Sequence, residues 1–277
     1  SLLIAELNHR VRNILNLIRG LVSLSKHDAM DVENFASIVA GRIAALASAH
    51  DNITQENWAP APLNKLFESE IDAYVRGTEH RFSLEGDHVL ISPEAYTVLA
   101  LVVHELITNS AKHGSLCDRS GSVQVTIART PDDNLSIAWR ERGGPPVRPP
   151  SRRGFGSTII EKSIPFELKG GAELRFVLTG LEADFTIPKR YVTVQPSDTV
   201  TGESAANAIS PDRAERESDH WPRHALVVED SMIIALDTEE SLKRLGVASV
   251  ETASGVSSAL AAIAAHPPDI AIVDFNL

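Results

Sequence analysis

The sequence predicts an α-helical hairpin, then a two-layer α/β sandwich, then the first half of a doubly wound parallel α/β sheet. Three observations lead to this fold class. Apolar residues near the start recur at helical spacings, the middle mixes helical and strand patterns, and the end alternates apolar strands with helices. The chain of 277 residues is also longer than one domain of roughly 100–200 residues.

The first 57 residues are assigned to the helical hairpin. Six apolar residues alternate spacings of 3 and 4, the seam of a helix that packs on another helix: Ile4, Leu7, Val11, Ile14, Ile18 and Leu21. Asp31 is the expected N-cap of a second helix that ends near Ile53. A hairpin with apolar surface on both sides usually buries it against another hairpin, so we expect a homodimer with a four-helix bundle.

Residues 58–190 are assigned to the sandwich, after a joint that contains Pro60 and Pro62. Ser92 and Pro93 are expected to open a long helix, because proline suits the first helical position. The expected helices are 63–75, 93–113 and 157–168, and the expected strands are 80–84, 88–91, 121–129, 135–140, 172–178 and 182–187.

Residues 191–223 contain few large apolar side chains and are expected to form a flexible linker. Residues 224–277 then show strands at 225–228, 248–251 and 270–273, with helices at 231–245 and 255–265 between them. This βαβαβ order is the start of a doubly wound parallel sheet.

Composition excludes some functions. The net charge of −11 and the lack of a dense Lys/Arg run argue against a nucleic-acid partner, and the longest apolar runs are too short to span a membrane. Cys117 is the single cysteine and cannot form an internal disulfide, so we expect a cytoplasmic location. The start lacks a signal-peptide pattern and the end directly follows a strand, so we expect a piece of a longer protein.

His9 is the first candidate for chemistry. It lies two positions after Leu7 on the seam, so it is expected to point away from the helix pair, beside Arg10 and Arg12. An exposed imidazole next to cations suits a phosphoryl acceptor. The alternative is a solvated surface histidine.

A second candidate lies on the long helix of the sandwich. Glu105, Asn109 and Lys112 are spaced i, i+4 and i+7, which places a carboxylate, an amide and an ammonium on one helix face. Carboxylate and amide oxygens suit Mg²⁺ that also binds nucleotide phosphates. The alternative is an ordinary polar face.

Two glycine clusters follow this helix. Glu141 and Gly143 come at the end of a strand, where the acid could accept a hydrogen bond from the amino group of a base. Gly154, Gly156 and Ser157 open a helix, whose backbone N–H groups would face phosphates. One such cluster before a helix is a weak signal, whereas two after an acid, amide and lysine face favour a nucleotide site.

Residues 1–190 resemble the transmitter of a sensor histidine kinase of the HWE subgroup. That name refers to a histidine, here His104, and to a Trp-x-Glu, here Trp139 and Glu141. Residues 6–13 resemble the phosphoacceptor box of the family, with His9 as the acceptor. The resemblance implies the ATP-binding fold shared with gyrase-type ATPases, with ATP and Mg²⁺ bound to it.

The resemblance also implies roles for individual residues. Asn109 would reach Mg²⁺, Glu141 would bind the adenine amino group and Glu105 would lie near the γ-phosphate. The implied nucleotide site consists of His104, Asn109, Lys112, Trp139, Glu141, Gly143, Gly154, Gly156 and Ser157. Two positions depart from the common pattern: Arg10 follows the acceptor where an acid is usual, and Pro145 replaces the last residue of the first glycine box.

The C-terminal segment resembles a response-regulator receiver. Glu229 and Asp230 end its first strand and Asp274 ends its third, so the three carboxylates are expected to meet at the carboxyl edge of the sheet. Such a cluster would hold Mg²⁺, and the resemblance implies Asp274 as the phosphoryl acceptor. Acids after strands are common in α/β proteins, and the sequence ends before the later strands of a receiver.

The sequence therefore predicts a hybrid sensor histidine kinase of a two-component system. It would transfer the γ-phosphoryl group of ATP to His9 and then to Asp274 or to a separate response regulator. One alternative is a catalytically degenerate dimerising phosphotransfer scaffold, which Arg10 and Pro145 favour. Another is a gyrase-like ATPase in which Glu105 activates water.

Overall fold

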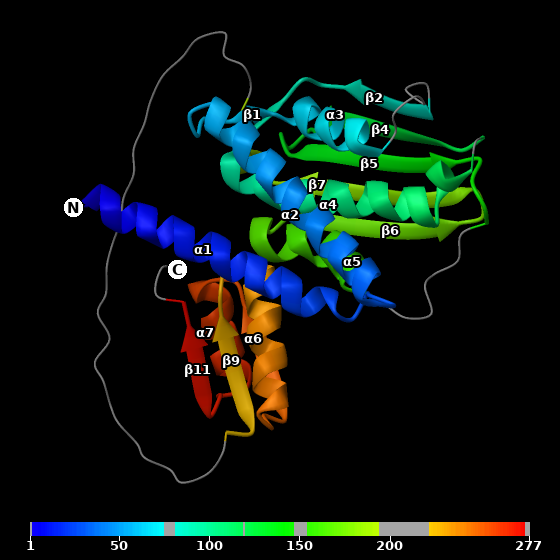
Figure 1. Ribbon diagram of the computed structural model, residues 1–277. Helices are drawn as coiled ribbons and strands as arrows, with labels where there is room; N and C mark the ends of the chain where they lie inside the picture. Colours follow the sequence, from blue (N-terminus) through cyan, green and yellow to red (C-terminus); the bar gives the residue numbers. More distant parts are fainter. Residues whose placement is uncertain (1, 75–80, 119, 147–153, 194–221, 275–277) are drawn as a thin grey trace.

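The structure, a computed structural model, describes residues 2–74, 81–118, 120–146, 154–193 and 222–274, with the side chains of 2–13 and 73–74 left out. Two long helices lie along one side of a five-stranded sheet and its covering helices, and a smaller α/β unit packs below them (Figure 1). Within these residues, no helix is long and apolar enough to cross a lipid bilayer.

Helices α1 (Leu2–Ser25) and α2 (Val32–Gln55) are joined by a short turn. Asp31 is the N-cap of α2, as predicted, because its Oδ1 accepts a hydrogen bond of 2.7 Å from the Asn34 N–H. Helix α2 also packs on a helix of the sandwich, α4 (Pro93–Lys112). The helical pair is thus attached to the sandwich along one of its sides.

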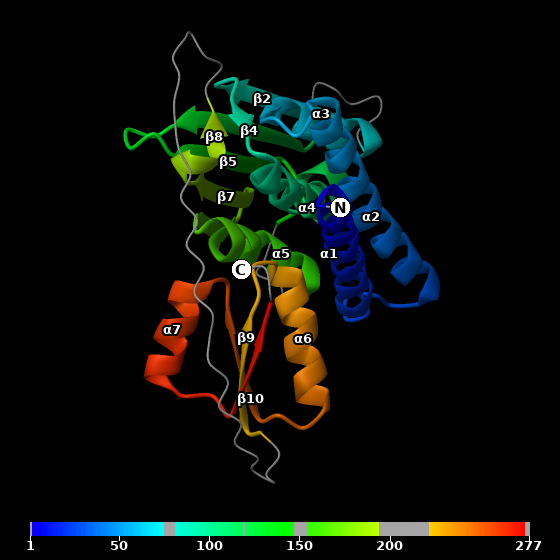
Figure 2. The ribbon, with the colours of Figure 1, turned by 90° about the vertical axis from the view of Figure 1, so that its left-hand side faces the viewer.

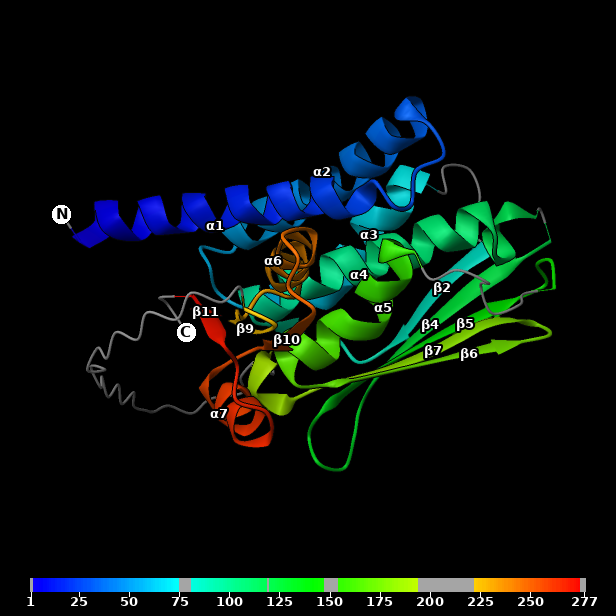
Figure 3. The same cartoon turned by 90° about the horizontal axis from the view of Figure 1, so that it is seen from below.

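The large sheet has the strand order β2-β4-β5-β7-β6. Its strands are β2 (Phe82–Gly86), β4 (Ser122–Arg129), β5 (Leu135–Arg142), β6 (Gly171–Val177) and β7 (Gly180–Ile187). The pair β2 and β4 is parallel and the other pairs are antiparallel. Helices α3 (Leu63–Tyr74), α4 and α5 (Phe155–Ser163) cover one face of this sheet, which confirms the predicted two-layer sandwich (Figure 3).

Short elements complete the sandwich, and two of them differ from expectation. The helix predicted to end at 168 changes at Ile164 into a π-helical turn, Ile164–Leu168, because Pro165 has no N–H to continue the α-helical ladder. Strand β8 (Val192–Thr193) lies where the linker was expected to begin, since it pairs with β3 (Leu90–Ile91). The remaining elements are β1 (Ala61–Pro62), η2 (Ser115–Cys117) and η4 (Lys189–Tyr191).

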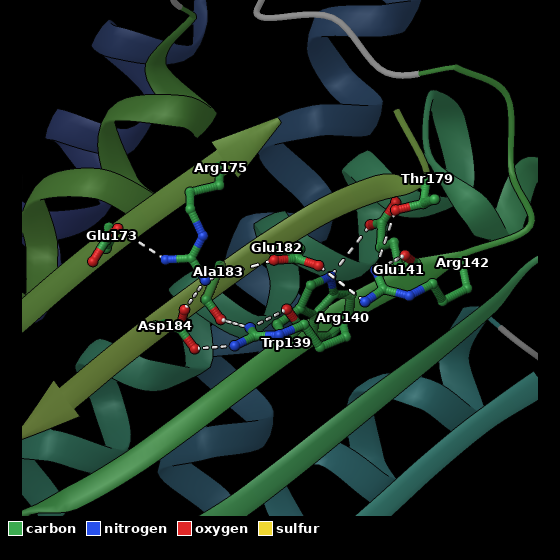
Figure 4. Close-up of polar contacts among 10 residues, drawn as sticks. All are labelled: Trp139, Arg140, Glu141, Arg142, Glu173, Arg175, Thr179, Glu182, Ala183 and Asp184. Carbon is green, nitrogen blue, oxygen red and sulfur yellow. Dashed lines mark hydrogen bonds and ion pairs between the residues drawn. The ribbon is translucent and has the colours of Figure 1, made fainter. Parts of the chain in front are cut away.

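The two faces of the large sheet differ in character. Alternate residues of β5, such as Ile137 and Trp139, are buried under the helices. On the opposite face, Arg140 donates hydrogen bonds of 2.9 Å to the Trp139 and Ala183 carbonyls (Figure 4). The ion pairs that accompany it are Arg140 with Asp184, Arg142 with Glu182, and Arg175 with Glu173, Glu182 and Asp184. These cross-strand contacts support the register of β5, β7 and β6.

The C-terminal unit has three parallel strands in the order β10-β9-β11. Its elements are β9 (His224–Val228), α6 (Met232–Arg244), β10 (Ser249–Ala253), α7 (Val256–Ala265) and β11 (Ile270–Val273). This order and the parallel pairing agree with the predicted βαβαβ arrangement. Of the predicted linker, 191–223, the part from 194 to 221 lies outside the described residues.

Helix α6 packs against α1, which joins the C-terminal unit to the rest of the molecule (Figures 1 and 2). Gly20 makes this approach possible, because a Cβ there would lie 2.8 Å from Ile233 Cγ2 and 3.2 Å from the Ile233 carbonyl oxygen. Two polar pairs flank the contact: Arg19 with Asp237 at 3.5 Å, and His27 with Glu240 at 3.1 Å. The position of α6 therefore depends on a residue without a side chain.

We predict that Gly20→Leu separates α6 from α1, because the added side chain would overlap Ile233. Amide hydrogen exchange in α6 is expected to rise at least about tenfold. Ala44→Leu adds the same side chain at an exposed position of α2 and should leave α6 unchanged. Equal exchange rates in the two variants would show that the contact is not needed to hold α6.

Candidate functional site

Helix α4 carries the centre of the site at its C-terminal half. Apolar side chains of α4, such as Leu99 and Leu106, are buried in the core, which fixes the rotation of the helix about its axis. Glu105, Asn109 and Lys112 consequently line one cavity of about 320 Å³, as their spacing predicts. Three elements form its walls: the helical pair, α4 and the start of α5. The lining residues are Asp28, Ser37, Ile38, Gly41, Arg42, His104, Glu105, Thr108, Asn109, Lys112, His113, Gly154, Gly156 and Ser157.

The helical pair contributes a buried cation that sequence reasoning missed. The Arg42 side chain is 2% exposed and donates to Glu105 Oε1 at 2.7 Å and to Asp28 Oδ2 at 2.9 Å. It also donates to the Ser25 hydroxyl at 2.5 Å. Burial alone lowers the pKa of Arg42, but its hydrogen bonds to Glu105 and Asp28 outweigh burial and raise it. One guanidinium thus links the turn between α1 and α2 to α4.

The N-terminus of α5 forms the facing wall. Its cap residue, Gly154, has no side chain to accept from the first helical N–H groups. Asp28 accepts from them instead, with 2.6 Å to the Phe155 N–H and 3.3 Å to the Gly156 N–H. A Cβ on Gly156 would overlap the Glu105 carboxylate, so only glycine permits this approach of α5 to α4.

His104 occupies a buried edge of the same cavity. Its Nδ1 lies 3.0 Å from Oε2 of Glu70 on α3, and both side chains are less than 10% exposed. A carboxylate partner fixes the orientation of the ring and its protonated nitrogen. His104 therefore couples α3 to the cavity through a polar contact inside the core.

A second cavity of about 390 Å³ adjoins the first and shares Asn109, His113 and Ser157 with it. The other residues that line it are Gly114, Glu141, Ile160, Glu161, Leu174, Phe176 and Leu181. Its walls are largely apolar around a single buried carboxylate, that of Glu141, which is 1% exposed. A flat, partly polar ring would find both apolar contact and a hydrogen-bond acceptor in it.

Trp139 and Gly143 line neither cavity, although the sequence placed them in the same site. Trp139 lies behind Glu141, where its indole N–H donates to Oε1 at 3.3 Å. The other oxygen, Oε2, accepts from the Ser115 N–H at 3.0 Å. Trp139 thus holds the carboxylate in place rather than facing the cavity. Gly143 has a φ of 72° at the end of β5, a conformation that suits glycine in a turn.

The carboxylates predicted to meet in the C-terminal unit do meet. Oxygens of Glu229, Asp230 and Asp274 lie within 4.8 Å of one another at the carboxyl edge of β9 and β11. Burial and the nearby acids raise the pKa of Glu229 to about 7. Glu167 of the sandwich lies close to this edge and accepts from the Met232 N–H at 3.1 Å, and its burial raises its pKa to about 8. Three oxygen donors at this separation fit a hard divalent cation.

Comparisons with known proteins find similar sequences and a similar solved structure. Residues 6–88 match the family HWE histidine kinase. The chain is also 29% identical over 191 residues to the blue-light-activated histidine kinase of Brucella ovis and 27% identical to that of Brucella anthropi. Each match covers 68% of this chain and 39% of the relative, so the chain spans about two fifths of these relatives.

The solved structure of the Erythrobacter litoralis EL346 blue-light activated histidine kinase has a similar fold. The match has a TM-score of 0.51 with 20% identity, and it covers 66% of this chain and 58% of that chain. The α/β sandwich with its helices accordingly shares the fold of the corresponding part of that histidine kinase.

His9, the predicted acceptor, lies within the segment that matches the HWE histidine kinase family. Its backbone belongs to α1, while its side chain is outside the described residues. The first cavity lies at the other end of this helix, next to Ser25 and Asp28. At 1.5 Å per residue, His9 and Ser25 are about 24 Å apart along the helix axis.

We predict that Arg42→Met lowers the free energy of unfolding by about 3 kcal/mol, because it leaves the buried carboxylates of Glu105 and Asp28 without their cation. Urea unfolding followed by circular dichroism measures this loss. Lys65→Met breaks the exposed pair with Glu56 and should cost less than about 0.5 kcal/mol. Equal losses in the two variants would contradict the structural role of Arg42.

Proposed function

We propose that this chain is the kinase portion of a hybrid sensor histidine kinase, which binds ATP in the two adjoining cavities and transfers the γ-phosphoryl group to His9. The observation that carries the proposal is the junction of the two cavities at Asn109 and Ser157. One cavity is polar and borders the α5 N-terminus, whereas the other has largely apolar walls around one buried acid, Glu141. A nucleotide likewise has two parts, charged phosphates that suit the polar cavity and a flat base that suits the apolar one.

The residues at the junction suit this ligand. In the proposed complex the adenine amino group donates to Glu141, and the phosphates extend toward Lys112 and the glycines of α5. Asn109 would supply an oxygen to Mg²⁺ and Glu105 would lie near the γ-phosphate, and the placement of both residues in the phosphate cavity supports these assignments. Mg²⁺ supplies neutralisation of phosphate charge during transfer.

The proposed transfer is an in-line displacement at the γ-phosphorus. An imidazole nitrogen of His9 forms the new N–P bond, the bond to the bridging oxygen breaks, and ADP leaves with the electron pair. The imidazole releases one proton to solvent water. Lys112 and the backbone N–H groups of α5 would hold the phosphates, so that most of the catalytic effect is positioning and charge stabilisation.

The second proposed transfer passes the phosphoryl group from His9 to Asp274 or to a separate response regulator. Support comes from the acidic cluster, in which Glu229 and Asp230 lie beside Asp274 at the sheet edge. Those two acids would hold Mg²⁺ while a carboxylate oxygen of Asp274 forms a bond to phosphorus, and the N–P bond to His9 would break with its electron pair returning to the imidazole.

We also propose that the helical pair forms a homodimer. An apolar cavity of about 440 Å³ lies between α1 and α2, lined by residues such as Leu17, Ile43 and Leu46. Ile14 and Leu15 are 43% and 61% exposed nearby. A second copy of the pair would cover this apolar surface in a four-helix bundle.

Incubation with γ-labelled ATP and Mg²⁺ tests the kinase. We expect an acid-labile label on the wild-type protein, loss of that label in His9→Ala, and retention in His266→Ala, which removes an exposed histidine of the C-terminal unit. Free phosphate without labelled protein would instead indicate a gyrase-like ATPase. If neither labelled protein nor free phosphate forms, both enzymatic functions are refuted and a dimerising phosphotransfer scaffold is favoured.

A titration with Mn²⁺ in the absence of nucleotide tests the acidic cluster. Asp274→Asn is expected to weaken binding of the ion at least about tenfold, because one of three clustered carboxylates is lost. Electron paramagnetic resonance of free Mn²⁺ measures the change. Asp132→Asn removes an exposed acid in a turn of the sandwich and should have no effect. Equal affinities in the two variants would show that the cluster is not the cation site.

A further inference from the structure

The turn between α1 and α2 places an anion in the cavity proposed for phosphates. The Asp28 carboxylate, whose side chain is 13% exposed, receives hydrogen bonds from three donors: the Phe155 N–H, the Gly156 N–H and Arg42 Nη2. A Cβ on Gly154 would lie 2.6 Å from Asp28 Oδ1, so the carboxylate lies directly against the α5 backbone. These donors are the groups that a phosphate oxygen would use.

Two anions cannot share these donors. Arg42 already balances Glu105 and Asp28, so a phosphate group added beside both carboxylates would have no further cation from Arg42. If Asp28 leaves, both α5 N–H groups and one nitrogen of Arg42 are released together. Lys112 faces the same cavity but is exposed, and its ammonium can bind phosphate without displacing a protein anion.

The contacts of Arg42 also hold the sandwich at the end of the helical pair where the turn joins α1 to α2. Arg42 binds Ser25 at the end of α1 as well as Glu105 on α4. The cavity is consequently kept at this end, whereas His9 lies about 24 Å away along α1. The contacts of Arg42 therefore both keep Asp28 in the cavity and keep the cavity away from His9.

We propose that Asp28 is a built-in competitor of the nucleotide: its carboxylate takes the place of a phosphate at the α5 N-terminus, and ATP must displace it to bind. This inference rests on the proposed function and adds a regulatory contact to that site. A signal that pulls the turn away from α5 would release the phosphate donors, and it would at the same time free the sandwich from the end of α1.

Calorimetric titration of the full chain with the non-hydrolysable analogue AMP-PNP and Mg²⁺ tests the proposal. Asp28→Asn keeps the size of the side chain but removes its charge, and it is expected to tighten binding about tenfold. Asp28→Ala should act in the same direction. Glu33→Gln removes an exposed charge from the first turn of α2 and should leave binding within twofold of wild type.

A second measurement separates displacement from charge repulsion. If AMP-PNP displaces Asp28, hydrogen exchange at residues 26–31 of the wild-type protein rises when the nucleotide binds. Tighter binding by Asp28→Asn without that rise would overturn the competition. Equal affinities of wild type and Asp28→Asn would also overturn it, yet leave the proposed kinase intact. A folded protein that binds no nucleotide in any variant would refute the nucleotide site itself.

Discussion

The buried guanidinium of Arg42 is the contact on which the arrangement of the molecule depends. A charge removed from water must be matched by nearby anions, and here the two anions come from different elements, the turn before α2 and helix α4. The Phe155 ring lies against the same guanidinium, with 5.0 Å from Arg42 Cζ to the ring centroid. The helical pair, α4 and α5 can therefore keep all these contacts only in one relative position.

Much of the fold was predictable because its signals are local. Ser92 and Pro93 mark the start of α4, Asp31 marks the start of α2, and the βαβαβ order of the C-terminal unit follows from alternating apolar segments. The spacing of Glu105 and Asn109 likewise determines that both face one cavity. These features require only helix and strand periodicity, which neighbouring residues set.

The contacts between distant segments were not predictable in the same way. Arg42 lies in the middle of an apolar helix pattern, and its partner Glu105 is 63 residues away, so no local pattern identifies the pair. The role of Asp28 at α5 depends on the same long-range packing. Trp139 differs, because residues two apart on a strand share a face, and the period of β5 already places its indole beside Glu141.

The C-terminal unit adds a second restraint to the position of the sandwich. Helix α6 contacts α1 at Gly20. At the start of α6, the Met232 sulfur accepts a hydrogen bond from the Ser163 hydroxyl of α5, and the Met232 N–H donates to Glu167. Helix α6 therefore touches both the helix that carries His9 and the sandwich that carries the cavity. A rearrangement that brings the cavity to His9 of the same chain must break these contacts as well as those of Arg42. Two separate sets of contacts, those of Arg42 and those of α6, thus oppose the same movement, and the cavity can reach His9 of the same chain only if both sets break.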